Sequence, residues 1–283
     1  MGIFSLTTLS TMAEKAVKPY WQDVQVVEVN KEYPRTSFMT YNNRADALSG
    51  KFERSKYYRL LNGTWKFYFV DSYKKLPENI TDPNTNTDSW NDIQVPGNWE
   101  VQGHGIAIYT NHGYEFKPRN PQPPTLPEAN PVGVYRRDID IPADWDGRDI
   151  YLHLAGAKSG VYVYINGQEA GYWPYGYNSF YVDATPYLKP GEKNELAVRL
   201  ENERESSRWY PGAGLYRNVH LVVTEDVHIP TWGTVITTPV VEDGFARVNV
   251  KTDLVMPEGK NVGNYRIVTE ILNPEGKRIS SDD

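Results

Sequence analysis

Carboxylate side chains are the most numerous groups in this chain that could do chemistry. The 283-residue sequence has 36 Asp and Glu residues, and some of them are spaced two positions apart, such as Glu201 with Glu203 and Asp138 with Asp140. Residues i and i+2 of a β-strand share a face, so each pair could combine a proton donor with an acceptor. On a sheet surface such carboxylates are solvated, and we expect that state for both pairs. The sequence therefore nominates no catalytic carboxylate pair.

Cysteine and histidine supply the other common reactive groups. Cysteine is absent, which excludes disulfides, a thiol nucleophile and a zinc site built on thiolates. The histidines show no spacing typical of a metal site, and we expect each to be a surface or interface residue; they are His104, His112, His153, His220 and His228.

One asparagine stands directly before a long proline-rich run. The stretch "IYTNHGYEFK" (Ile108–Lys117) is followed by "PRNPQPPTLPEANP" (Pro118–Pro131). Prolines exclude a central strand, because they lack the amide donor. A long ordered loop is commonly functional, and prolines hold it extended at low entropic cost. Asn111 could therefore present its amide as both donor and acceptor, or could be a turn residue before His112-Gly113.

Charge and hydropathy exclude several classes of protein. The net charge is −6, the pI is about 5.5, and no basic stripe alternates with aromatic residues, so we expect no nucleic-acid partner. No stretch approaches the roughly 18 apolar residues of a membrane span, so we expect no membrane partner. Residues 1–20 read as an N-terminal tail or as the remnant of a signal peptide or cloning sequence. A chain without cysteine suits the periplasm and the cytoplasm equally, so the compartment stays open.

Short strands dominate the sequence from residue 21. Val161, Val163 and Ile165 alternate with tyrosines and end at Asn166-Gly167, which predicts a β-hairpin. Further strands are expected at Gly63–Val70, Arg136–Ile141, Leu196–Leu200 and Val219–Val223. One short helix or turn is expected within residues 44–63. Many short strands with Gly and Pro turns predict an all-β antiparallel sandwich.

A second unit begins near Thr224. Alternation over residues 246–250 predicts a strand, a further strand is expected from Tyr265 to Ile271, and "NPEG" (Asn273–Gly276) is a turn. These roughly 60 residues hold three or four strands, whereas an immunoglobulin-like sandwich takes about 100 residues and seven strands. We therefore expect one complete sandwich followed by an incomplete immunoglobulin-like domain, over residues 21–223 and 224–283.

Several stretches, in this order, carry a resemblance to a known family. They are "LNGTWKFYF" (Leu61–Phe69), "VPGNWEVQGHGIAIYTNHGYEF" (Val95–Phe116), "NPVGVYRRDIDIP" (Asn130–Pro142), "GAKSGVYVYINGQEAGY" (Gly156–Tyr172) and "SRWYPGAGLYRNVHL" (Ser207–Leu221). Together they resemble the N-terminal part of family 2 glycoside hydrolases, above all the β-galactosidases. The resemblance covers nearly the whole chain from about Trp21.

The resemblance implies a jelly-roll sugar-binding domain, then an immunoglobulin-like domain, then a TIM barrel that carries two catalytic glutamates. The barrel is missing here. The family's acid/base glutamate lies in a Trp-Gly-Asn-Glu context, whereas the Asn194-Glu195 pair follows "KPGEK" and enters a strand. Retaining hydrolysis needs two carboxyls about 5 Å apart. This chain alone is therefore expected to be inactive, with the missing barrel and a β-galactoside as partners of the intact enzyme, which could also be a homo-oligomer.

The resemblance also nominates three substrate-binding residues. Asn111 matches the asparagine that hydrogen-bonds substrate hydroxyls. An aspartate that contacts the galactosyl group and a sodium ion in the better-known branch is replaced here by Arg208, as in a second branch. Arg208 or Glu203 could reach the sugar instead, or Arg208 and Trp209 could pack the loop. An arginine cannot ligate sodium, so no metal site is expected in this chain, although an intact parent could use magnesium or sodium. Gly212 and Gly214 are expected to adopt positive φ.

Other functions fit parts of the sequence. The chain has 21 Tyr and 8 Trp, and Trp173, Tyr175 and Tyr177 could form the aromatic platform of a free-standing carbohydrate-binding module. A domain that binds only protein is a further alternative. A β-glucuronidase or β-mannosidase parent would share the same layout. "IYTNHGY" and "NPVGVYRRDIDIP" favour a β-galactosidase.

Overall fold

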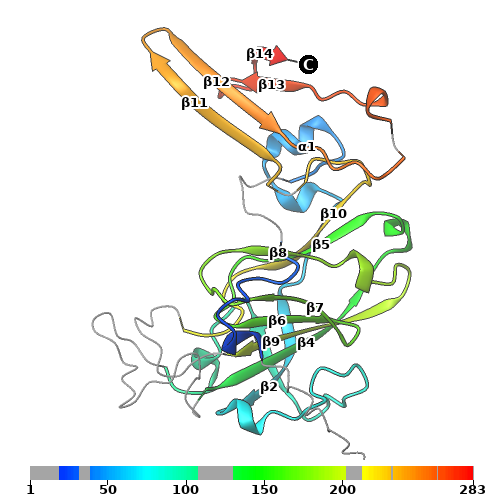
Figure 1. The fold of residues 1–283 in the computed structure, drawn as a ribbon, viewed down its shortest axis with the longest axis vertical. Helices are drawn as coiled ribbons and strands as arrows, with labels where there is room; N and C mark the ends of the chain where they lie inside the picture. Colours follow the sequence, from blue (N-terminus) through cyan, green and yellow to red (C-terminus); the bar gives the residue numbers. More distant parts are fainter. Residues whose placement is uncertain are drawn as a thin grey trace, which may run out of the picture.

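The computed structural model describes residues 19–31, 39–107, 130–201, 212–230, 232–259 and 261–282. Most of these residues form an antiparallel β-sandwich, as the alternating sequence pattern predicts (Figure 1). The larger sheet has the order β3-β2-β4-β9-β6-β7 and the smaller one the order β1-β10-β5-β8. The strands of the larger sheet are β2 (Gly63–Val70), β3 (Asn91–Val95), β4 (Val132–Asp140), β6 (Val161–Ile165), β7 (Gln168–Trp173) and β9 (Lys193–Glu201). Those of the smaller sheet are β1 (Tyr58–Leu60), β5 (Asp149–Leu154), β8 (Phe180–Asp183) and β10 (Val219–Thr224).

One hydrophobic core fills the space between the two sheets. Its residues alternate along the strands: in β2, Trp65 and Phe67 are buried, while the intervening Lys66 points outward. The facing sheet contributes Leu152 and Phe180 to the same cluster. Burial of each such side chain stabilises the fold by roughly 1.5–3 kcal/mol.

Turn chemistry fixes the hairpin between β6 and β7. Asn166 and Gly167 have φ values of 52° and 76°, the left-handed pair that a two-residue type I′ turn requires. The predicted hairpin is confirmed, with Val161 paired to Trp173 and Ile165 to Gln168.

Helical structure is confined to short segments. The helix α1 (Arg44–Ser49) begins where the Asn43 side chain accepts a hydrogen bond from the backbone of Asp46, and it ends at Gly50 in the left-handed conformation. Single 3₁₀ turns occur at Tyr20–Gln22, Phe52–Arg54, Tyr73–Lys75, Glu100–Gln102, Ala143–Trp145, Thr185–Tyr187 and Val262–Asn264. Within the described ranges, no helix is long and apolar enough to cross a membrane.

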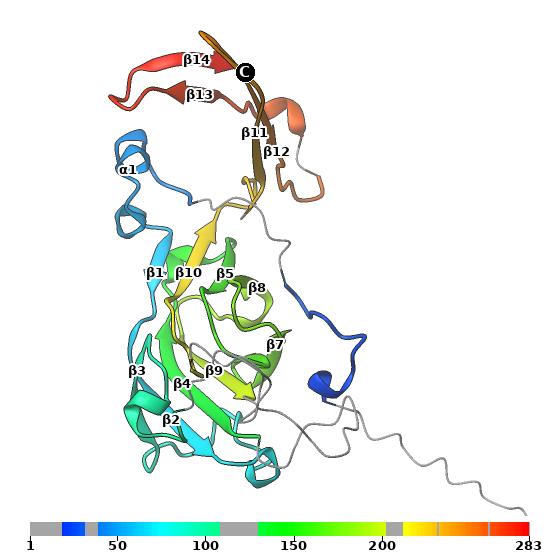
Figure 2. The ribbon, with the colours of Figure 1, turned by 90° about the vertical axis from the view of Figure 1, so that its left-hand side faces the viewer.

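Residues 19–31, here called the N-terminal strap, connect the open edges of the two sheets (Figure 2). Val29 bridges to Tyr172 of β7, and Lys31 bridges to Val182 of β8. Asn30, between them, donates through Nδ2 to the carbonyl oxygens of Ala170 (2.8 Å) and Asp183 (3.2 Å). The strap therefore covers two edge strands whose backbone groups would otherwise be unpaired.

Two hairpins follow β10 and lie beyond the sandwich (Figures 1 and 2). The first pairs β11 (Thr234–Glu242) with β12 (Phe245–Thr252), and the second pairs β13 (Thr269–Leu272) with β14 (Arg278–Asp282). The predicted turn is present, because Gly276 donates its backbone amide to Asn273. The strand predicted from Tyr265 begins only at Thr269, so that prediction was wrong for residues 265–268. The alternating apolar residues at 265–268 pair with no strand in the part of the chain that the structure describes.

Candidate functional site

The three substrate-binding residues predicted from the sequence lie outside the described residues. Asn111 belongs to residues 108–129, and Glu203 and Arg208 belong to residues 202–211. Their roles in substrate binding therefore stay predictions. It does describe the residues that border both segments, and these define where each segment leaves and rejoins the sandwich.

The described residues that border the two segments lie at the same end of the sandwich. Val132, three residues after the first segment ends, is the register partner of Glu201, the last residue before the second segment. The backbone amide of Trp99 donates to the carbonyl of Ala213, at the point where the second segment rejoins (3.2 Å). The Trp99 ring lies so close over Gly133 that a Cβ there would stand 2.3 Å from it. Residues on either side of the segments are thus packed together at this end.

Glu100 anchors the backbone at Ala213, where the chain rejoins the sandwich. Its two carboxylate oxygens accept from the amide of Ala213 at 3.0 and 3.1 Å, while Asn98 Nδ2 donates to the carbonyl of the same residue at 3.2 Å. Burial raises the pKa of Glu100, and the hydrogen bonds it receives oppose that rise. The arrangement positions a loop and leaves both oxygens engaged, so Glu100 serves here as a positioning group.

Two glycines make this close packing possible. Gly212 has φ +72° and Gly214 has φ +108°, as predicted. A Cβ on Gly212 would meet Asn98 Nδ2 at 2.9 Å, and one on Gly214 would meet the carbonyl oxygen of Gly97 at 2.8 Å. Any side chain would therefore force the loop away from its anchor.

A buried lysine connects this loop to a pair of exposed tyrosines. Lys158 and Gly214 exchange two backbone hydrogen bonds, at 3.1 and 3.2 Å, and the Lys158 residue is 5% exposed. Tyr175 and Tyr177, on the turn between β7 and β8, are 50% and 39% exposed. Trp173 instead packs partly buried against the core, beneath the ammonium of Lys31. The aromatic platform suggested by the sequence thus includes two rings and not three.

Two polar side chains at this end are buried. Asn130 is fully buried, and neither amide atom hydrogen-bonds within the described part of the chain. Glu201 is also buried, with Arg199 Nε 3.2 Å from its carboxylate. The expectation that Glu201 is a solvated surface carboxylate was therefore wrong, because the neighbouring arginine compensates the charge.

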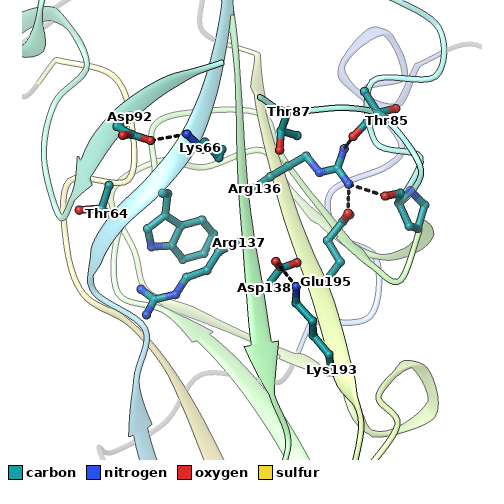
Figure 3. Close-up of a pocket in the computed structure, with 12 residues that line it drawn as sticks. Thr64, Lys66, Thr85, Thr87, Asp92, Arg136, Arg137, Asp138, Lys193 and Glu195 are labelled. Atoms are coloured by element: carbon teal, nitrogen blue, oxygen red, sulfur yellow. Dashed lines mark hydrogen bonds and ion pairs between the residues drawn. The ribbon is translucent and has the colours of Figure 1, made fainter. Parts of the chain in front are cut away.

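A separate hollow of about 460 Å³ lies on the outer face of the larger sheet (Figure 3). At its centre the buried Arg136 donates to the carbonyls of Thr85 and Pro83 and forms an ion pair with Glu195. Around it, Lys193 pairs with Asp138 at 2.7 Å and Lys66 with Asp92 at 2.8 Å.

Carboxylates in this hollow are held by cations. Asp138 and Glu195 are register partners on β4 and β9, yet each carboxylate is engaged by its own basic side chain. A retaining hydrolase needs one carboxyl as the proton donor and the other free to attack, whereas both carboxylates here are already engaged in ion pairs with basic side chains. Glu195 therefore stabilises the sheet, in agreement with its sequence context.

Of the four histidines among the described residues, His104 packs against Phe67 and Phe69 of the larger sheet, and the other three lie on or beside the smaller sheet. His153 and His220 contact each other, and His228 is buried nearby against Tyr151. Burial lowers the pKa of His153 to about 3, with a contribution from His220, and lowers that of His220 to about 4. No three His, Asp or Glu side chains among the described residues are grouped so that they could hold a metal ion.

An antiparallel sandwich with loops gathered at one end is the architecture of many carbohydrate-recognising jelly rolls. Residues 58–225 match the family described as "Glycosyl hydrolases family 2, sugar binding domain". The chain belongs to this family, as the resemblance implied.

Relatives with known names agree with this assignment. The chain is 33% identical over 240 residues to Beta-galactosidase BoGH2A of Bacteroides ovatus, which covers 83% of this chain and 26% of that protein. It is 31% identical over 219 residues to a Beta-galactosidase of Priestia megaterium, covering 75% of this chain and 21% of that protein. The chain thus spans about a quarter of these relatives.

Solved structures share the fold. A glycosyl hydrolase family 2 member from Bacteroides cellulosilyticus aligns with a TM-score of 0.59 at 24% identity, covering 80% of this chain and 28% of that one. A family 2 β-glucuronidase aligns with a TM-score of 0.61 at 23% identity, covering 80% of this chain and 24% of that one.

The role of Glu100 was missed by the sequence analysis. The motif that contains Glu100 was located, but its role depends on the fold, which brings Glu100 to Ala213.

Proposed function

We propose that this chain is the N-terminal region of a β-galactosidase-type retaining glycoside hydrolase and forms one wall of its active site. The observation that carries the proposal is that the described residues bordering two segments, 108–129 and 202–211, are packed together at one end of the sandwich. One segment contains Asn111, and the other contains Glu203 and Arg208. Residues bordering both are joined through the pairing of Val132 with Glu201 and the contact of Trp99 with Ala213.

The three residues have complementary roles toward a neutral sugar. The amide of Asn111 both donates to and accepts from hydroxyl groups. Arg208 supplies a planar set of donors, and Glu203 supplies acceptors. Glu100 and Asn98 hold the backbone of Ala213, five residues after Arg208, and a fixed anchor of this kind favours precise positioning of a nearby substrate-binding group.

The catalytic carboxyls come from a barrel domain elsewhere in the longer enzyme. The two buried glutamates of the sandwich are not set up for the two steps of retaining hydrolysis, since Glu195 and Glu201 are both engaged by arginines. The names of the curated relatives favour a β-galactoside as the substrate.

Kinetics of the longer enzyme that contains this chain test the proposal. With nitrophenyl β-galactoside, Asn111→Ala should lower kcat/KM about two-fold to a few-hundred-fold, because one or two hydrogen bonds of roughly 0.5–1.5 kcal/mol each are lost. Arg208→Gln should also lower kcat/KM, and the 283-residue chain alone should show no turnover above background. Asp88→Ala, at an exposed loop position, is the matched control and should leave kcat/KM unchanged.

Two results would contradict the proposal. One is turnover by the purified chain alone. The other is unchanged kinetics per folded molecule in both the Asn111 and the Arg208 variants, with a lowered melting temperature for Asn111→Ala. That second pattern would identify Asn111 as a turn residue.

A further inference from the structure

We infer that Tyr175 and Tyr177 form a saccharide-contact site on the loop between β7 and β8, separate from the proposed active-site residues. Both rings are exposed, at 50% and 39%, and their centroids lie 5.5 Å apart with the planes tilted by 56°. The C–H faces of a pyranose pack against such rings, and the phenol hydroxyls can hydrogen-bond to its rim. The ligand class is a neutral oligosaccharide.

The loop is held rigidly in place. The hydroxyl of Tyr216 donates to the carbonyl of Gly176, between the two tyrosines, at 2.6 Å. Gly176 packs so tightly on Lys158 that a Cβ would stand 2.9 Å from its Cα. A preformed surface loses little conformational entropy when a ligand binds, so two rings suffice for weak, specific contact.

The loop lies close to the proposed active-site wall. Lys158, beneath Gly176, is bridged to Gly214, close to where the segment with Arg208 rejoins the sandwich. A saccharide chain that extends out of the proposed active site could therefore continue over the tyrosines. This last step rests on the proposed function; binding of a saccharide by the two rings does not.

Size and charge favour a neutral saccharide over other occupants. Two half-exposed tyrosines offer on the order of 200 Å², well below the roughly 800 Å² per partner of a stable protein interface. Lys158 stands 5.8 Å from the Tyr177 centroid and is buried, so it is poorly placed to pair with an acidic sugar. Ring stacking thus supplies most of the recognition.

Titration of the 283-residue chain with β-1,4-galactotetraose, followed by NMR shifts and calorimetry, tests the inference. Tyr175→Ala and Tyr177→Ala should each weaken binding about five-fold, because each loses roughly half of a ring's burial, and the double variant should lose binding. Tyr177→Phe keeps the ring face and should retain most of the affinity. Tyr265→Ala, a tyrosine that is 43% exposed on the second unit, is the matched control and should bind like the parent chain.

Three outcomes would overturn the inference: no binding up to the solubility limit of the probe, binding that survives in the folded double variant, or tighter binding of tetragalacturonate than of galactotetraose. Melting curves of every variant separate lost contact from lost fold. The titration needs no catalytic domain, so a failure to bind saccharide would not affect the kinetic test of the proposed function. A negative kinetic test would likewise leave the binding result unaffected.

Discussion

His153 and His220 contact each other through Nδ1 and Nε2, 2.9 Å apart, from neighbouring strands β5 and β10. The ring of Tyr181 stacks on His153 at 4.1 Å, and Tyr58 packs on His220 at 4.7 Å. The remaining nitrogens, His153 Nε2 and His220 Nδ1, are buried and make no hydrogen bond within the described part of the chain. If either ring took up a second proton, the new N–H group would find no hydrogen-bond acceptor among the described residues.

This arrangement predicts loss of stability in mild acid. Burial lowers the pKa of both folded histidines, to about 3 and about 4, whereas in the unfolded chain they titrate near about 6.5. Between these values the unfolded state binds more protons, so the free energy of unfolding falls as the pH falls from about 6.5 towards about 4. Urea unfolding at a series of pH values measures the slope, and the double variant His153→Gln/His220→Gln should flatten it. An equally steep slope in the double variant would contradict this assignment.

Glu100 should matter through the loop that it anchors. Glu100→Ala leaves the buried amide of Ala213 without its acceptor, which costs roughly 1–3 kcal/mol, while Glu100→Gln keeps one acceptor oxygen and should cost less. In the longer enzyme, both variants should lower kcat/KM, in the same order, if the loop places Arg208. Thermal unfolding and kinetics of the two variants check this, with Asp88→Ala as control. A stability loss with unchanged kcat/KM would restrict Glu100 to a structural role.

Local chemistry made much of the sandwich predictable. Asn166-Gly167 specifies its turn without help from the rest of the chain, and the alternation of Trp65 and Phe67 with polar residues marks the inner face of β2. Such signals involve residues only a few positions apart, so they can be read from a single sequence. The strand predicted from Tyr265 had the same alternation, but strand formation there depends on a partner that the pattern does not supply.

The site was less predictable, because its contacts join distant residues. Arg136 and Glu195 are charged residues that a sequence pattern places at the surface, yet the fold buries them against each other. Trp173 and Tyr175 are two positions apart and similar in chemistry, and only the end of β7 decides that the first packs on the core while the second is exposed. The role of Glu100 likewise required the register that brings residue 213 beside it.

The N-terminal strap predicts a stability effect that separates side chain from backbone. Asn30 has φ 49° and donates two hydrogen bonds that join β7 to β8. Asn30→Gly tolerates the backbone conformation and should cost about 1–2 kcal/mol from the lost bonds. Asn30→Ala adds the strain of the left-handed region, roughly 1–2 kcal/mol more. Urea unfolding of both variants gives the comparison, and equal losses would show that the backbone conformation adds nothing.

The hairpins of the second unit should open before the sandwich does. Apolar side chains on β11 and β12 remain exposed, among them Ile236 at 55% and Val248 at 38%, so little burial offsets the entropy of ordering these strands. Strand edges at β11 and β14 are also unpaired among the described residues. Amide hydrogen exchange of the monomeric chain should therefore show weak protection in residues 234–282 and strong protection in β4, β6 and β9.

A matched pair of substitutions sharpens this prediction. Val250→Ala in β12 should leave the main unfolding transition in place, because the side chain is 36% exposed in a unit that opens early. Val198→Ala in β9, where the side chain is fully buried in the core, should lower the same transition, since it leaves a cavity that typically costs on the order of 1–3 kcal/mol. Equal protection of the hairpins and the sandwich, or equal effects of the two substitutions, would contradict this prediction. Either result would mean that the chain unfolds as one cooperative unit. The hairpins would then gain their stability from contacts with the rest of the chain, such as the ion pair between Arg44 and Glu270.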